Sequence, residues 1–205
     1  MREDHALLII DIQNDFCLGG PLEVPGAEQI VEPVNRLMRE YSCVVATQDW
    51  HPENHFSFLS EHPGEAPFTS IRWRDSEQVI WPDHCIAGSA GADFQADLDT
   101  EHIDLILRKG TNPNIDSYSA FYENDKVTIT GLAGYFRERG ITTIDICGLA
   151  ADVCVFYTAV DARREGFSVN VLLNAVRGIN NPVGTLRSRY DQMRELSINL
   201  IEKQG

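Results

Sequence analysis

The chain has 205 residues, 43% of them hydrophobic, and a formal net charge of −14. This length can bury the core of one α/β domain, so we expect a single domain over residues 1–205. The negative charge would repel phosphate backbones and anionic lipid, which argues against nucleic acid and membranes as partners. No apolar stretch reaches the roughly 20 residues of a bilayer span, and residues 1–5 run into a strand pattern rather than a signal peptide, so we expect a cytoplasmic protein.

Strand and helix patterns alternate along the chain, with no internal repeat. In chain order we expect a strand at 6–12, a helix at 28–41, strands at 43–47 and 103–108, a helix at 130–139, a strand at 142–147, a helix from about 152, a strand at 168–173, a helix at 183–196 and a sixth strand at 198–201. This alternation predicts a three-layer α/β/α fold with a mostly parallel six-stranded sheet and helices on both faces. Residues 50–100 are interrupted by prolines and glycines, which predicts a long functional loop.

Three groups that can perform covalent amide hydrolysis each follow an apolar, strand-like run: Asp11, Lys109 and Cys154. Parallel sheets gather their active groups beyond the carboxyl ends of such strands, so we expect these residues to share one crevice. A carboxylate can take the thiol proton, and an ammonium can stabilise the thiolate. A buried Asp–Lys ion pair with a purely structural role is the alternative.

Cys154 differs in position from the other cysteines. The five cysteines are widely spaced and contain no C-x-x-C pair, which favours reduced thiols over disulfides. Cys43 and Cys147 lie inside predicted strands and are expected to be core residues. Cys154 follows the turn at Gly148 and falls in the first turn of a helix, where the helix dipole favours thiolate and the free N–H groups could receive an oxyanion.

A second group of side chains is typical of a metal site. Four of the six histidines fall in residues 50–100, and Asp49 precedes His51 by two, so that both can face one ion from an extended backbone. His84 could complete an open site with three protein ligands. His55 is a candidate fourth ligand, and His62 is expected on an exposed loop. Histidines that merely face solvent are the alternative.

Six motifs then carry a resemblance that spans nearly the whole chain in the same order. They are Asp11-Ile12-Gln13-Asn14-Asp15-Phe16, Gly19-Gly20-Pro21-Leu22, Asp49-Trp50-His51-Pro52, Trp81-Pro82-Asp83-His84-Cys85, Lys109-Gly110 and Gly148-Leu149-Ala150-Ala151-Asp152-Val153-Cys154-Val155. The chain resembles the nicotinamidase/pyrazinamidase family, which belongs to the isochorismatase-like cysteine hydrolases. The segment from Asp116 to Phe121 is also similar to one that follows the lysine in bacterial members.

The resemblance implies the roles of the site residues. It implies Cys154 as nucleophile, Asp11 as general acid/base and Lys109 as the third catalytic residue. The backbone N–H groups of Ala150 and Cys154 match the family's oxyanion hole, with a cis peptide between Leu149 and Ala150.

The resemblance also implies a substrate pocket, a metal and a reaction. Its substrate-binding residues would be Phe16, Leu22, Trp81 and Ala150, and its divalent metal would be held by Asp49, His51 and His84. Zinc is the first choice for this metal, iron or manganese are alternatives, and no organic cofactor is needed. The expected reaction converts nicotinamide to nicotinate and ammonia in NAD salvage, and also pyrazinamide to pyrazinoate.

Two positions depart from the family pattern, and two other functions stay open. Ala151 stands where members often have Thr, and Val153 where they have Tyr or His, which affects the polar lining of the pocket rather than the reaction. A related cysteine hydrolase of ureido, carbamoyl or biuret-type amides is one alternative, and a non-enzymatic metal or thiol module is the other. The assembly is left open between a monomer and a homo-oligomer.

Overall fold

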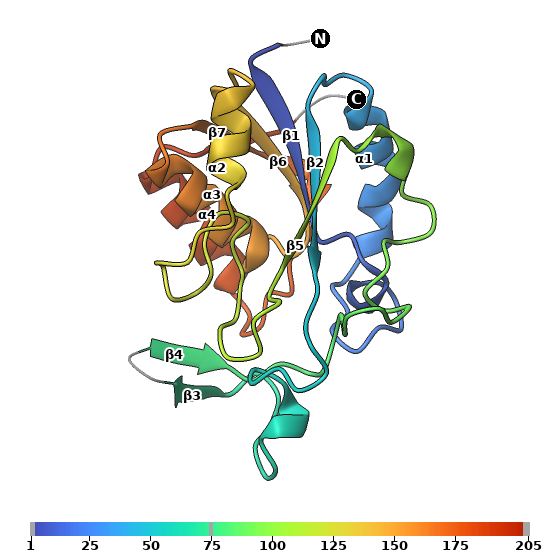
Figure 1. The fold of residues 1–205 in the computed structure, drawn as a ribbon, viewed down its shortest axis with the longest axis vertical. Helices are drawn as coiled ribbons and strands as arrows, with labels where there is room; N and C mark the ends of the chain where they lie inside the picture. The colour runs from blue at the N-terminus through green and yellow to red at the C-terminus, as the bar shows by residue number, and fades with distance from the viewer. Residues whose placement is uncertain (1–2, 74–75, 203–205) are drawn as a thin grey trace.

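The computed structural model describes residues 3–73 and 76–202, and its centre is a six-stranded parallel sheet (Figure 1). The order across the sheet is β5-β2-β1-β6-β7-β8, and every pairing is parallel. The strands are β1 His5–Ile10, β2 Val44–Asp49, β5 Leu105–Lys109, β6 Thr143–Gly148, β7 Ser168–Val176 and β8 Asn199–Ile201. The predicted parallel six-stranded sheet is confirmed.

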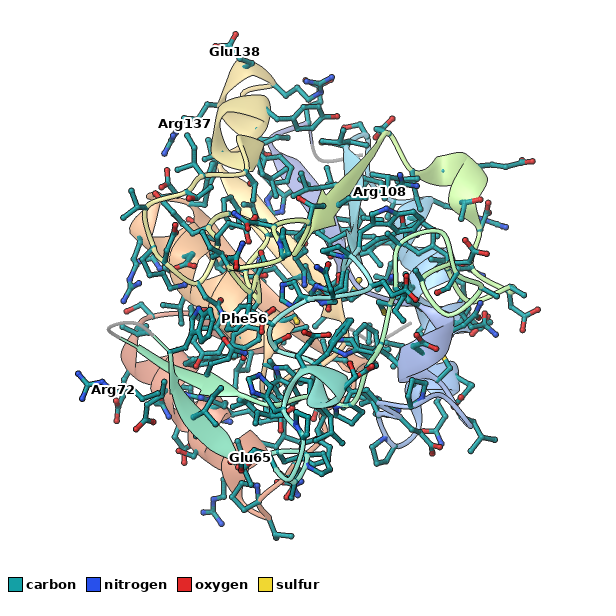
Figure 2. All side chains as sticks on the ribbon, turned by 60° about the horizontal axis from the view of Figure 1, so that its bottom comes forward. Phe56, Glu65, Arg72, Arg108, Arg137 and Glu138 are labelled. Atoms are coloured by element: carbon teal, nitrogen blue, oxygen red, sulfur yellow. The ribbon has the colours of Figure 1, made fainter. Side chains whose placement is uncertain are left out.

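Helices cover both faces of this sheet, as predicted. In Figure 1, α1 (Val31–Met38) lies on one side, and α2 (Leu132–Glu138), α3 (Cys154–Arg164) and α4 (Thr185–Glu195) lie on the other. β1 explains why both faces are needed: Leu7 and Ile9 pack in the α1 core, while Leu8 belongs to the core under α2 and α3. A strand that is apolar on both faces is stable only when both are covered. Arg137 and Glu138 of α2 point away from the molecule (Figure 2).

Some element boundaries differ from the sequence pattern. The helix expected at 28–41 begins as a 3₁₀ turn, Ala27–Ile30, and continues as α1 only to Met38. The helix expected from about Asp152 begins at Cys154, because Val153 has φ −124° and ψ −98°, which is not helical. This difference places the thiol on the first helical residue.

Residues 50–100 are more ordered than a loop. They contain an antiparallel hairpin, β3 (Ser70–Trp73) and β4 (Ser76–Val79), which the sequence analysis missed. The strands have four residues each and half-exposed faces, too short to produce a clear period. Figure 1 shows the hairpin beyond the carboxyl ends of the sheet strands. The rest is tied down by backbone hydrogen bonds, such as His51 N–H to the Cys85 carbonyl (3.0 Å).

The strand order creates a crevice between β1 and β6. The chain continues from β1 to β2 on one side and from β6 to β7 on the other, so the connections diverge at this point. Ligands of parallel α/β sheets bind at such a switch point. Gly148 ends β6 with φ 109°, and a Cβ there would lie 2.1 Å from the Ile10 carbonyl oxygen. Only glycine therefore lets the segment before Cys154 turn so close to Asp11.

Two expectations from composition can be compared with this fold. Within the described residues no helix combines the length and apolar character needed to cross a bilayer. All five cysteines lie in the described part of the chain, all are buried, and no disulfide joins them.

Candidate active site

Asp11, Lys109 and Cys154 meet at the carboxyl edge of the sheet. Asp11 follows β1, Lys109 is the last residue of β5, and Cys154 is the first of α3. Lys109 Nζ lies 2.9 Å from Asp11 Oδ2 and 3.5 Å from Cys154 Sγ, and it also contacts Asp49 Oδ1. All these side chains are buried. The structure thus brings together the three residues that the sequence analysis grouped.

Burial and mutual charge set the protonation of this group. Burial would lower the pKa of Lys109, but the carboxylates of Asp11 and Asp49 hold it well above its ordinary value, so Lys109 is an ammonium. Burial raises the pKa of Asp11, with Lys109 opposing the shift. Burial also raises the pKa of the Cys154 thiol well above its ordinary value; Lys109 opposes this and Asp11 adds to it. The helix dipole is therefore outweighed, and the resting thiol carries its proton.

Two backbone donors belong to the segment 149–154, which leads into α3. The expected cis peptide between Leu149 and Ala150 is present. The Ala150 carbonyl accepts the N–H groups of Val153 (3.0 Å) and Val155 (3.1 Å). Within the described residues, the N–H groups of Ala150 and Cys154 have no hydrogen-bond acceptor. Unused N–H groups beside a nucleophile are the arrangement that can receive a tetrahedral oxyanion.

Asp49, His51 and His84 form a buried cluster that can hold a cation. Their candidate ligand atoms all lie within 4.8 Å of one another, and each histidine Nε2 is 3.8 Å from Asp49 Oδ2. His51 Nδ1 lies 2.9 Å from the Gly110 carbonyl oxygen and His84 Nδ1 lies 2.7 Å from that of Pro82. A carbonyl accepts only, so each Nδ1 carries a hydrogen, and the neutral form of each ring would turn a bare Nε2 toward Asp49.

The charge of this cluster also fits a divalent cation. Burial would lower the pKa of His51, but the Asp49 carboxylate raises it, so the cluster attracts positive charge.

The space for the His51 ring depends on Gly110, whose φ is +66° and whose Cβ, if present, would lie 2.3 Å from His51 Cε1. One carboxylate and two imidazoles with open positions beside a pocket are typical of catalytic zinc sites and of related metals.

The other two loop histidines have different surroundings. His55 does not belong to the Asp49 cluster: it groups with His51 and Asp116, and its Nδ1 lies 2.8 Å from Ser57 Oγ. The structure therefore offers no support for His55 as a fourth ligand in the cluster with Asp49. His62, expected to be exposed, is half-buried, and its Nε2 lies 2.6 Å from the Phe56 carbonyl oxygen.

A small pocket opens above the thiol. It contains about 380 Å³ of space not filled by protein atoms, open solvent included. The pocket is lined by all four residues expected to bind substrate, Phe16, Leu22, Trp81 and Ala150. Asp49, His84 and Cys154 line it as well. Val153 lines it too, whereas Ala151 is fully buried in the core and does not. The expected effect on pocket lining thus applies to Val153 and was wrong for Ala151.

Polar residues that the sequence analysis missed support the site from behind. Thr47 Oγ1 donates a 2.6 Å hydrogen bond to Asp11 Oδ1. The Gln13 amide accepts the Asp49 N–H and donates to the Asp49 carbonyl, both over 2.8 Å. The sequence signal that could have identified Thr47 and Gln13 was a polar side chain in or beside a strand that is otherwise apolar.

The hairpin contributes a second set of missed residues. Gln78 of β4 donates from Nε2 to Asp116 Oδ2 (2.6 Å) and to the Tyr118 hydroxyl (3.0 Å). The Tyr118 hydroxyl also accepts the Trp81 indole N–H over 3.1 Å. Asp116, Tyr118 and Trp81 all line the pocket, so a hairpin side chain fixes one of its walls.

A buried thiol, carboxylate and ammonium beside an Asp–His–His cluster, at the edge of a parallel sheet, define an isochorismatase-like cysteine hydrolase. Residues 5–197 match the family model described as the isochorismatase domain. The chain is 44% identical, over 98% of its length and 93% of the relative, to the nicotinamidase of Acinetobacter baylyi. The chain belongs to the nicotinamidase/pyrazinamidase family.

Solved structures agree with this assignment. An Acinetobacter baumanii nicotinamidase pyrazinamidase superposes with a TM-score of 0.95 at 44% identity, covering 98% of this chain and 97% of that one. PnC1 of L. infantum in complex with nicotinate gives 0.85 at 38% identity, covering 97% and 92%. The pyrazinamidase of Pyrococcus horikoshii in complex with zinc gives 0.80 at 34% identity, covering 98% and 99%.

Proposed function

We propose that this protein is a nicotinamidase that hydrolyses nicotinamide to nicotinate and ammonia, and pyrazinamide to pyrazinoate by the same chemistry. The observation that carries the proposal is the Cys154 thiol, 3.5 Å from a Lys109 ammonium that also pairs with Asp11, at the base of an aromatic pocket. Its relatives are nicotinamidases, and the nicotinate complex of L. infantum PnC1 supports the choice of ligand.

The pocket selects a flat aromatic amide. Phe16 and Trp81 line the pocket with aromatic rings that can pack against a pyridine, and Leu22 adds an apolar wall. The Tyr118 hydroxyl restrains the Trp81 indole, so the ring is held without a further loss of side-chain freedom. A carboxamide placed above Cys154 then reacts as a group already in position.

Asp11 moves the proton in both halves of the reaction. It takes the proton from the Cys154 thiol, whose raised pKa makes a base necessary, and Lys109 balances the charge that develops. The thiolate attacks the amide carbon, and the N–H groups of Ala150 and Cys154 receive the oxyanion. Asp11 then protonates the departing ammonia, which leaves a thioester on Cys154. Asp11 finally activates a water that hydrolyses this thioester to the carboxylate.

We propose that Asp49, His51 and His84 hold one divalent metal. When bound, it would supply a Lewis acid for the ring nitrogen and so orient the amide. The oxygen and nitrogen donors suit zinc first, with iron or manganese as alternatives. The zinc complex of the P. horikoshii pyrazinamidase supports this choice. We also propose a cytoplasmic location, where thiols such as Cys154 stay reduced.

An ammonia-release assay tests the function. Purified protein is incubated with nicotinamide, pyrazinamide, benzamide and a ureido amide, with Cys154→Ala as the control. We expect rapid release from the two ring amides that contain a pyridine-type nitrogen, and none from the variant. Release from the ureido amide alone would contradict the proposal and favour the related amide hydrolases. Elemental analysis of the same sample should find about one metal ion per chain.

A further inference from the structure

A second cavity adjoins the catalytic pocket and shares four wall residues with it: Trp81, Tyr118, Val153 and Ile179. We call it the outer cavity. It has about 840 Å³ of unfilled space, open solvent included, against about 380 Å³ for the catalytic pocket. Because the walls are shared, a molecule in the outer cavity would lie next to one in the catalytic pocket.

An aromatic wall leads from the catalytic pocket to a cation. The Trp81 ring packs on Tyr118 with centroids 6.0 Å apart, and Tyr118 packs on Tyr157 at 5.3 Å. Arg189 of α4 ends this wall, donating from Nη2 to the Tyr157 hydroxyl over 3.3 Å. Its guanidinium carbon lies 4.3 Å from the Phe156 ring centroid. The positive charge is thus fixed at the outer end of the wall.

Arg189 lacks an acidic partner in the described part of the chain. Its guanidinium donates only to neutral oxygens, of Tyr157 and Gln192, both at 3.3 Å, and its Nε has no acceptor. Asp152, which also lines the outer cavity, is already engaged, because its two carboxylate oxygens accept backbone N–H groups at 2.9 and 2.7 Å.

We propose that the outer cavity binds an aromatic carboxylate, with its ring against Tyr157 and Trp81 and its carboxylate on Arg189. The natural ligand of the outer cavity would be the nicotinate that the catalytic pocket produces, and this part of the inference rests on the proposed function. Hydrolysis turns a neutral amide into an anion, and a charge-assisted hydrogen bond to Arg189 favours the anion. The outer cavity therefore distinguishes product from substrate and retains product beside the catalytic pocket.

Benzoate is the probe, since it has the carboxylate and ring but no ring nitrogen. Its binding is measured by ligand-observed NMR on the wild type, Arg189→Met and Arg187→Met. Arg187 is an exposed arginine on the same helix and lines a different surface hollow, so it is the matched control. We expect Arg189→Met to weaken benzoate binding roughly threefold to tenfold, and Arg187→Met to leave it unchanged. Arg189→Lys, which keeps the charge, should lose less than Arg189→Met.

Kinetics give a second readout. At saturating nicotinamide the catalytic pocket is filled, so remaining inhibition by benzoate or nicotinate must come from the outer cavity. We expect both to lower kcat of the wild type and of Arg187→Met, but not of Arg189→Met. Purely competitive inhibition, or equal benzoate binding by all variants, would overturn the inference. The NMR arm needs no turnover, so it stands even if nicotinamide is not the substrate; an absence of nicotinamide hydrolysis would fail the proposed function alone.

Discussion

Thr47 Oγ1 donates a 2.6 Å hydrogen bond to Asp11 Oδ1, so a neutral hydroxyl shares this carboxylate with the Lys109 ammonium, which lies 2.9 Å from Oδ2. The bond favours the charged form of Asp11 and so limits the rise of its pKa that burial causes. Thr47→Val removes the donor at nearly constant shape, so the pKa of Asp11 should rise further. Asp11 must be ionised to act as base, so the acid limb of kcat/KM should move to higher pH. Thr47→Ser should restore the profile, and an unchanged limb in Thr47→Val would contradict the assignment.

Cys154→Ala should abolish turnover, by about 10³-fold or more as for other nucleophiles, while nicotinamide still binds. Iodoacetamide should also modify Cys154 before the core thiols of Cys43 and Cys147, because Cys154 lines the pocket. Because the Cys154 pKa is raised, this labelling should speed up with rising pH. Mass spectrometry of the labelled peptides checks the order, and substantial amidase activity in Cys154→Ala would rule out the covalent mechanism.

Lys109→Met should destabilise the fold. It leaves the buried carboxylates of Asp11 and Asp49 without their counter-ion, a change that typically costs about 3–5 kcal/mol of unfolding free energy. Without the ammonium, the ionised carboxylates remain buried with no counter-ion, which destabilises the folded state. The fall in unfolding free energy should therefore be largest near neutral pH and shrink as acid protonates the carboxylates. Urea unfolding at several pH values measures this. Lys126→Met, which removes a half-exposed ammonium from the buried Asp161 while Arg164 still pairs with it, is the control and should cost less than Lys109→Met.

His51→Ala and His84→Ala test whether a metal selects the ring. Each removes a ligand from the cluster, so the apparent dissociation constant for nicotinamide should rise several-fold to several hundred-fold, at about 1.4 kcal/mol for each tenfold. Benzamide has no ring nitrogen, so it should bind poorly to the wild type and to both variants. Calorimetric titration of the two amides decides this. Equal binding of both by metal-loaded wild type would show that the ion does not recognise the ring.

Gln78→Leu should change substrate binding more than chemistry. The substitution removes the donor to Asp116 and Tyr118, which frees the Tyr118 hydroxyl and the Trp81 ring that it restrains. We expect KM for nicotinamide to rise several-fold with kcat within about twofold, since Gln78 does not touch the thiol. Glu77→Ala, an exposed neighbour on the same strand, is the control. A large fall in kcat at constant KM would place Gln78 in the chemical step instead.

The sheet could be predicted because its strands are apolar on both faces and end in chemically distinctive residues. Asp11 and Lys109 could be recognised as charged residues at the ends of apolar runs. Because the strands are parallel, both residues lie at the same edge of the sheet. Hairpin β3–β4 was not predictable, because strands of four residues with half-exposed faces carry no clear period. Its importance comes from one contact, that of Gln78 with residues about 40 positions away.

The protonation states and hydrogen-bond partners of the site residues were harder to predict than their identities. The position of Cys154 at a helix start suggested a thiolate. Burial and the nearby carboxylates instead raise the pKa of the thiol. His55 has the residue type and spacing of a metal ligand, yet its ring turns to Ser57. Sequence spacing does not specify which acceptor a ring nitrogen meets. The N–H groups of Ala150 and Cys154 depend likewise on backbone conformation, which the resemblance alone indicated.

The two oxygens of Asp49 face different groups, Oδ1 toward the Lys109 ammonium and Oδ2 toward the two imidazoles. If the proposed metal is held there, exchanging one ion for another would alter the electric field at Lys109, and so the rate of acyl transfer, even without moving the thiol. Substrate affinity and turnover cannot be tuned separately through this carboxylate. Directed evolution toward a new metal should accordingly accept changes at His51 or His84 before any change at Asp49.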